Sequence, residues 1–311
     1  MANIERKVDQ ILTISDSKEQ SDRLFALIDE VSSGQVGAQC CTLFNRMLQA
    51  DFTQHQSRSC LVHFAENCKS MAKDALVEVC THSIAEIKDK GGVYDEVDYI
   101  MKTELFDYYS GCAEFLDAAQ ILAAVNVESP NKVLTATEKV DLLIKVAECY
   151  LMLKETIEAE VFTNKASQYM NDVDSSNLPL QLRYRAVVAQ VYDGNRKFLE
   201  ASLKYYELSK FTDSGIVAED LLQLLGKATT CAVLSKTGPQ RTRVLGLLYN
   251  DARLPQLDDT PPFCSHSNVL RKMFREFILQ ADELVQFEDS LEVHQRAVSR
   301  YAPPFETVFD P

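Results

Sequence analysis

Glycine and proline are scarce in this chain of 311 residues, which contains 10 glycines and 9 prolines. No proline occurs before Pro130. Because proline interrupts helices and sheets and glycine weakens both, their scarcity favours long, uninterrupted secondary structure. No strand-rich stretch is present either, and the sequence therefore predicts an all-α protein.

Signals for membrane insertion and secretion are missing as well. No run of about 18 apolar residues could cross a bilayer, and the charged opening MANIERKVDQ lacks the apolar core of a signal peptide. The 9 cysteines are an odd number without a secreted disulfide pattern. We therefore expect a protein of the cytoplasm and nucleus, with no membrane partner.

Positive charge is in deficit, because 32 lysines and arginines stand against 46 acidic residues and give a net charge of −14. A surface of that sign repels phosphate groups, so we expect no nucleic-acid partner. Solubility explains most of this acidic surface, and the alternative is a surface for a basic partner.

Motifs for catalysis and cofactor binding are also absent. The sequence has no Gly-rich phosphate loop, no G-x-S-x-G, no H-E-x-x-H and no His-x-His. Cysteine and histidine lie near each other at Cys60, His63 and Cys68, at Cys80 and His82, and at Cys264 and His266. Structural zinc needs four ligands, and no two C-x-x-C pairs occur. We expect no metal, no cofactor and no enzyme; a Cys–His nucleophile pair stays open, although nothing in the sequence orients it.

What the sequence does contain is a helical repeat, seen best over residues 180–208. Two apolar stripes with helical spacing flank Asp193-Gly194-Asn195, residues that tolerate a left-handed turn. The stripes are Tyr184, Val187, Val188 and Val191, and then Phe198, Ala201, Tyr205 and Leu208. So short a link predicts an antiparallel helical hairpin, in which the small Ala201 lets the backbones approach closely.

Two earlier segments repeat this pattern. Tyr192 is followed six residues later by Phe198-Leu199-Glu200-Ala201, as Tyr150 is by Thr156-Ile157-Glu158-Ala159 and Tyr109 by Phe115-Leu116-Asp117-Ala118. The tyrosines are 41 and then 42 residues apart, and a further 42 residues reach Leu234, before a turn and a helix from Pro239. A period near 40 with two helices in each unit predicts an α-α superhelical solenoid.

The rest of the chain completes this architecture. We expect a divergent N-terminal cap over residues 1–92, a helical-repeat arm over residues 93–300 and an irregular tail over residues 301–311. The cap contains helices over residues 17–31, 40–50 and 57–87, and Ser17 and Thr135 open capping boxes. The arm ends in a single long apolar stripe that runs from Leu270 through Phe277 and Ile278 to Leu284.

Aromatic and basic side chains are the remaining candidates for binding. The pairs Tyr108–Tyr109 and Tyr205–Tyr206 could be mistaken for an aromatic cage, but their helical spacing favours core positions. Arg241, Arg243 and Arg253 are conspicuous in an acidic chain. They form either a solvated helix face or an interface for an acidic partner, because arginine favours forked contacts with carboxylates.

Several runs resemble subunit 4 of the COP9 signalosome, a family of the PCI class. They are Arg196-Lys197-Phe198-Leu199-Glu200-Ala201, Gly238-Pro239-Gln240-Arg241-Thr242-Arg243-Val244-Leu245 with Asp251-Ala252-Arg253, Asn164-Lys165-Ala166-Ser167, and His294-Gln295-Arg296-Ala297. The similarity is best over residues 140–253. After His294 a family member continues into a winged helix, whereas this chain reaches Pro303-Pro304 and Pro311, so we expect no winged helix within it.

The resemblance implies a non-catalytic scaffold whose helical arm contacts other signalosome subunits and a cullin–RING ubiquitin ligase. The signalosome removes NEDD8 from that ligase through a zinc isopeptidase in a different subunit. The alternatives are the equivalent subunit of the proteasome lid and a free-standing repeat adaptor. The candidate partner-binding residues are Arg196, Lys197, Arg241, Arg243 and Arg253.

Overall fold

The computed structural model describes residues 2–14, 17–34, 36–49, 53–90, 92–174, 176–211 and 216–296. Within these ranges every regular element is a helix and no strand occurs, so the predicted all-α repeat fold is confirmed. Contacts divide the chain into two compact units, Met1–Leu153 and Lys154–Pro311. The predicted tail over residues 301–311 lies outside the described residues.

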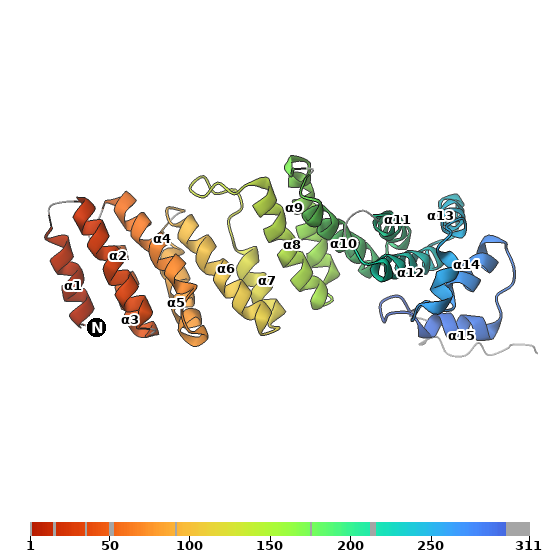
Figure 1. Cartoon of the computed structure of the whole chain (residues 1–311), viewed down its shortest axis with the longest axis horizontal. Helices are drawn as coiled ribbons and strands as arrows, with labels where there is room; N and C mark the ends of the chain where they lie inside the picture. Colours follow the sequence, from red (N-terminus) through yellow and green to blue (C-terminus); the bar gives the residue numbers. More distant parts are fainter. Residues whose placement is uncertain are drawn as a thin grey trace, which may run out of the picture. The chain divides into compact units, whose positions relative to one another are not determined.

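The first unit is a stack of helices that follow one another in chain order (Figure 1). They are α1 (Ala2–Leu12), α2 (Ser17–Ser33), α3 (Gly37–Gln49), α4 (Gln54–Cys68), α5 (Lys73–Ile87), α6 (Asp95–Gly111), α7 (Phe115–Ala123) and α8 (Ala136–Met152). Helix α2 packs on α4, α3 packs on α5, and both α4 and α5 pack on α6. This pairing of alternate helices is typical of stacked two-helix repeats.

The prediction of a single helix over residues 57–87 is wrong, because two helices lie there. Helix α4 ends at Cys68, and Ala72 adopts extended backbone before α5 begins. The chain turns there because both helices must place their apolar faces against the same core, which contains Phe64 of α4 and Val79 of α5. The helix predicted over residues 17–31 is present as α2, while the cap predicted at Ser17 lies outside the described side chains.

The capping box predicted at Thr135 is confirmed. The Thr135 hydroxyl accepts a hydrogen bond from the backbone N–H of Glu138, and the Glu138 carboxylate accepts one from the backbone N–H of Thr135. Hydrogen bonds from Thr135 hold the pKa of Glu138 below its usual range. The sequence therefore fixes where α8 begins, because two otherwise unpaired backbone N–H groups are satisfied together.

The second unit contains the predicted hairpin. Its helices are α9 (Thr156–Tyr169), η1 (Met170–Asp172), α10 (Leu178–Gly194), α11 (Phe198–Ser209), α12 (Ala218–Leu234), α13 (Pro239–Tyr249), η3 (Leu254–Asp259), α14 (His266–Phe274) and α15 (Ala281–Asp289). Helix α11 packs between α10 and α12, and its buried face includes Phe198, Ala201 and Tyr205. The predicted start of α13 at Pro239 is confirmed, as expected for proline in a first helical turn.

The repeated tyrosines occupy equivalent places. Tyr109, Tyr150 and Tyr192 each lie two residues before the end of a helix, and the next helix begins six residues after each of them. The alanines at the matching position of the following helix, Ala118, Ala159 and Ala201, are all fully buried. The repeat read from the sequence is therefore a repeat in the structure.

The turns between these helix pairs also repeat, but not at the residue that the sequence indicated. The left-handed residues are Ala113, Lys154 and Arg196, with φ of 61°, 64° and 58°. In the last turn, the backbone N–H of Lys197 donates to the carbonyl of Tyr192 and closes the end of α10. Gly194, which was predicted to make this turn, is still helical. It is needed for a different reason, because a Cβ there would lie 2.3 Å from Cγ2 of Thr156.

The single apolar stripe predicted from Leu270 to Leu284 is also wrong. Helix α14 ends at Phe274, Glu276 is left-handed with φ of 58°, and α15 begins at Ala281. Phe277 and Ile278 lie in the link and are 60% and 85% exposed. Their spacing resembles one helix face, although the chain turns between α14 and α15. Within α15 the buried residue is Phe287.

Candidate functional site

Arg241, in the run that most resembles the signalosome family, joins three helices of the second unit. Its guanidinium donates hydrogen bonds from Nε to the carbonyl of Ala232 at 3.3 Å and from Nη2 to the carbonyl of Val233 at 2.6 Å. Nη2 also lies 3.9 Å from Sδ of Met273 in α14. These contacts give Arg241 a role inside the fold, because the last carbonyls of α12 have no hydrogen-bond partner within their own helix.

Arg253 has a comparable intramolecular role. Its guanidinium pairs with Asp251, with Nη2 at 2.8 Å from Oδ2, and Nη2 also reaches Oγ of Ser209 at 3.2 Å. Burial alone would raise the pKa of Asp251, but the hydrogen bonds from Arg253 lower it overall. The pair ties the start of η3 to the end of α11.

The other basic candidates differ in how firmly they are held. Lys197 forms an ion pair with Glu160 of α9, and this hydrogen bond raises the pKa of Lys197. Arg196 is exposed and lies over the ring of Phe198, with 5.6 Å from Cζ to the ring centre. Arg243 lies on the exposed face of α13, one turn before Leu247, which is 45% exposed.

Sequence reasoning missed a buried polar cluster of the second unit, which centres on Asp193 near the end of α10. The Asp193 side chain is only 6% exposed. Nε2 of Gln295 donates to both carboxylate oxygens, at 3.0 and 3.1 Å, and Nε2 of His294 lies 3.1 Å from Oδ1. Two runs that resembled the family separately, around Arg196 and around His294, therefore meet at one site.

Two further side chains face the Asp193 carboxylate. They are Tyr205 of α11 and Cys231 of α12, and the charge of Asp193 acts on both groups. Burial, and then the negative charge of Asp193, raise the pKa of Tyr205 well above its usual range, and the same causes act on the pKa of Cys231. Both groups therefore stay neutral at physiological pH.

The tyrosine pairs are seam residues, as the helical spacing predicted, but to different degrees. Tyr205 and Tyr206 are buried, at 2% and 9% exposure. Tyr108 and Tyr109 are half-buried and make an edge-to-face contact with ring centres 5.3 Å apart. In an edge-to-face pair, the edge of one ring covers a face of the other. An aromatic cage would need that face open to a cation.

The histidines considered as metal ligands each contact a different partner, whereas Cys68 and Cys80 are neighbours, and Cys80 raises the pKa of the Cys68 thiol. Nε2 of His63 is 2.9 Å from Asp29, Nε2 of His82 is 3.1 Å from Asn45, and Nε2 of His266 is 2.8 Å from Thr230. Among the residues that the structure describes, no group of three or more His, Cys, Asp or Glu side chains could hold a metal ion.

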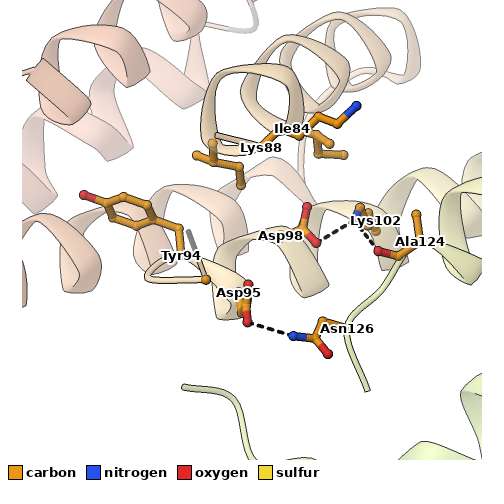
Figure 2. A pocket seen from close by; sticks show the side chains of 10 residues that line it. Ile84, Lys88, Tyr94, Asp95, Asp98, Lys102, Ala124 and Asn126 are labelled. Carbon is orange, nitrogen blue, oxygen red and sulfur yellow. Dashed lines mark hydrogen bonds and ion pairs between the residues drawn. The ribbon is translucent and has the colours of Figure 1, made fainter. Parts of the chain in front are cut away.

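A cavity of about 380 Å³ lies in the first unit, between the end of α5, the start of α6 and the link after α7 (Figure 2). Ile84, Ile87 and Tyr94 contribute apolar walls. On its floor Nζ of Lys102 lies 2.6 Å from Oδ2 of Asp98 and donates to the carbonyl of Ala124 at 2.8 Å. Burial raises the pKa of Asp98, and the hydrogen bond from Lys102 opposes that shift. The cavity therefore contains an ion pair rather than charge of one sign.

Over the described part of the chain, none of the helices combines the length and the apolar character that crossing a bilayer requires.

These features define an all-α helical-repeat protein in which polar side chains such as Arg241 and Asp193 join one segment to another. A family model described as "PSMD12/CSN4, N-terminal" matches residues 3–216. The chain belongs to this family. The chain is similar to curated proteins named COP9 signalosome complex subunit 4, as the family-like runs predicted.

The similarity to these relatives extends over most of the chain. The chain is 30% identical to the Arabidopsis thaliana protein, and the alignment covers 93% of this chain and 73% of the relative. The Dictyostelium discoideum protein is 27% identical, with 95% and 72% covered, and the Emericella nidulans protein is 28% identical, with 81% and 59% covered. The chain therefore corresponds to only part of the length of each relative.

Proposed function

We propose that this protein is a non-catalytic scaffold subunit of a COP9 signalosome complex. Family membership carries the proposal, and the helical-repeat fold supports it, because stacked hairpins offer a long surface for protein partners. The intramolecular contacts of Arg241, Arg253 and Lys197 are those of a scaffold, in which charged side chains fix helices.

The finer parts of the proposal follow from the family resemblance. Other signalosome subunits are the direct partners, and the complex acts on cullin–RING ubiquitin ligases by removing NEDD8 through a different subunit. The protein works in the cytoplasm and nucleus, and its acidic charge argues against nucleic acid as a partner. The equivalent subunit of the proteasome lid is the alternative. The names of the relatives reported above favour the signalosome.

Among the five basic candidates, Arg243 is the best choice for a partner contact. It lies in the family-like run of α13 on an exposed face, beside the exposed Leu247, whereas Arg241 in the same helix is used internally. An exposed arginine next to an aliphatic side chain suits an interface that contains a carboxylate. Arg196 and Lys197 remain secondary candidates at the α10–α11 turn.

Native mass spectrometry of the tagged, full chain purified from its own cells tests both the assignment to a signalosome and the role of Arg243. We expect the other signalosome subunits to co-purify; lid subunits in their place, or no subunits, would refute the assignment. Arg243→Glu should reduce their recovery at least about tenfold. The matched control is Arg271→Glu, because Arg271 is an exposed arginine on α14. Equal recovery with both variants would remove Arg243 from the interface.

A further inference from the structure

Residues 292–296 form a short segment that turns back onto the repeat, and its own hydrogen bonds keep it compact. The backbone N–H groups of Gln295 and Arg296 both donate to the carbonyl of Glu292, at 3.0 and 3.2 Å. Nε of Arg296 donates to the carbonyl of Leu291 at 3.1 Å. The segment is irregular, so other contacts must hold it against the hairpin.

Gln295 provides such a contact, beside His294, whose Nε2 lies 3.1 Å from Oδ1 of Asp193. The amide orientation of Gln295 is defined at both ends. Its carbonyl oxygen accepts a hydrogen bond from the backbone N–H of Glu292 at 3.1 Å. Its Nε2 donates to both oxygens of Asp193, and the whole residue is only 5% exposed. One side chain thus connects the fold of the segment to its attachment.

The attachment point is the repeat turn between α10 and α11. Asp193 is in the last turn of α10, and Nη1 of the left-handed Arg196 donates to the carbonyl of Arg296 at 3.4 Å. The partners are about 100 residues apart in the chain. The core of the hairpin does not include residues of the segment; it consists of side chains such as Phe198, Ala201 and Tyr205.

We propose that Asp193 and Gln295 form a latch, which holds residues 292–296 on the α10–α11 turn and can open while the hairpin stays folded. A buried carboxylate is costly unless it is hydrogen-bonded, and Gln295 provides two of its bonds. Opening the latch returns the carboxylate to water, so the open state contains no unpaired buried charge. This conformational device goes beyond the proposed function and does not depend on it.

Hydrogen–deuterium exchange of the full chain tests the latch, because the backbone N–H groups of Glu292, Gln295 and Arg296 are protected only by the folded segment. Gln295→Glu keeps the shape of the side chain but sets a carboxylate against Asp193. We expect exchange over residues 290–296 to accelerate by about tenfold or more. Exchange in α10 and α11 should stay within about twofold of the unchanged protein.

The double variant Asp193→Asn with Gln295→Glu provides a rescue, since it exchanges the amide and the carboxylate and restores a donor–acceptor pair. We expect it to recover most of the protection that Gln295→Glu loses. The matched control is Gln286→Glu, which adds the same charge at an exposed position of α15 and should change nothing.

Three results would overturn the latch. Exchange over residues 290–296 could be unchanged in Gln295→Glu, or it could rise together with exchange in α10 and α11, which would make Asp193 an ordinary core residue. Local acceleration that the double variant does not reverse would show that the two side chains are not a pair.

Discussion

Replacing Arg241 separates its role inside the fold from a role toward partners. Helix α12 ends at Leu234 without the left-handed closure that ends α10, and its C-cap residue, Ser235, is extended. Arg241 therefore supplies the donors that a closing turn would otherwise supply, to the carbonyls of Ala232 and Val233. Arg241→Ala should destabilise the second unit.

The size of the effect follows from these two bonds. A hydrogen bond with a charged partner contributes about 1.5–3 kcal/mol when it is buried. The Arg241 side chain is only half-buried, and water can replace it at the carbonyls, so we take about 2 kcal/mol for the pair. For a unit of this size that corresponds to a melting temperature lower by about 4–8 °C.

Urea denaturation and thermal melting of the full chain measure this loss. Arg241→Lys should recover less than half of it, because a single ammonium group cannot reach both carbonyls with a planar fork. Arg243→Ala is the matched control on the same helix and should shift stability by no more than about 0.5 kcal/mol. Equal effects of the two alanine variants, or no effect of Arg241→Ala, would refute the clamp.

Three other perturbations test the packing of the second unit. Phe198→Ala should cost about 3–5 kcal/mol in urea denaturation, because Phe198 is 8% exposed in the hairpin core. Gly226→Ala should be destabilising despite its better helix propensity, since the new Cβ would lie 2.4 Å from the ring of Phe263; a raised melting temperature would contradict this. Burial lowers the pKa of His266 from 6.5 to about 4. Folding therefore favours neutral His266, and stability should fall by up to about 3 kcal/mol as pH drops from about 6.5 to about 4. His266→Gln should flatten that part of the profile, and a profile that His266→Gln leaves unchanged would show that another group is responsible.

Local features of the fold could be predicted from the sequence because they depend on neighbouring residues. The cap at Thr135, the start of α13 at Pro239 and the buried Ala201 each follow from chemistry within a few positions. The break between α14 and α15 could not be predicted in this way. Phe277 and Ile278 continue an apolar period across a turn, and only the tertiary structure shows that they are exposed.

The candidate site was predictable only in pieces. Resemblance pointed to the runs that contain Arg196 and His294, and the structure shows that both meet near Asp193. Periodicity gives no signal for contacts between residues about 100 positions apart. The charge of Arg241 makes it a candidate for partner binding, yet its guanidinium donates to helix carbonyls, because a sequence does not show which arginines face inward.

The turns show why the spacing was more informative than the residue types. Left-handed backbone disfavours side chains with a Cβ by about 1 kcal/mol or more, so Asp193-Gly194-Asn195 looked like the turn. The structure instead places the left-handed residues at Ala113, Lys154 and Arg196, which share the spacing of the tyrosines. At the Arg196 turn, α10 ends and α11 begins at positions that place Ala201 in the hairpin core. Packing of the hairpin therefore sets the left-handed conformation of the turn residue, even though that residue has a Cβ.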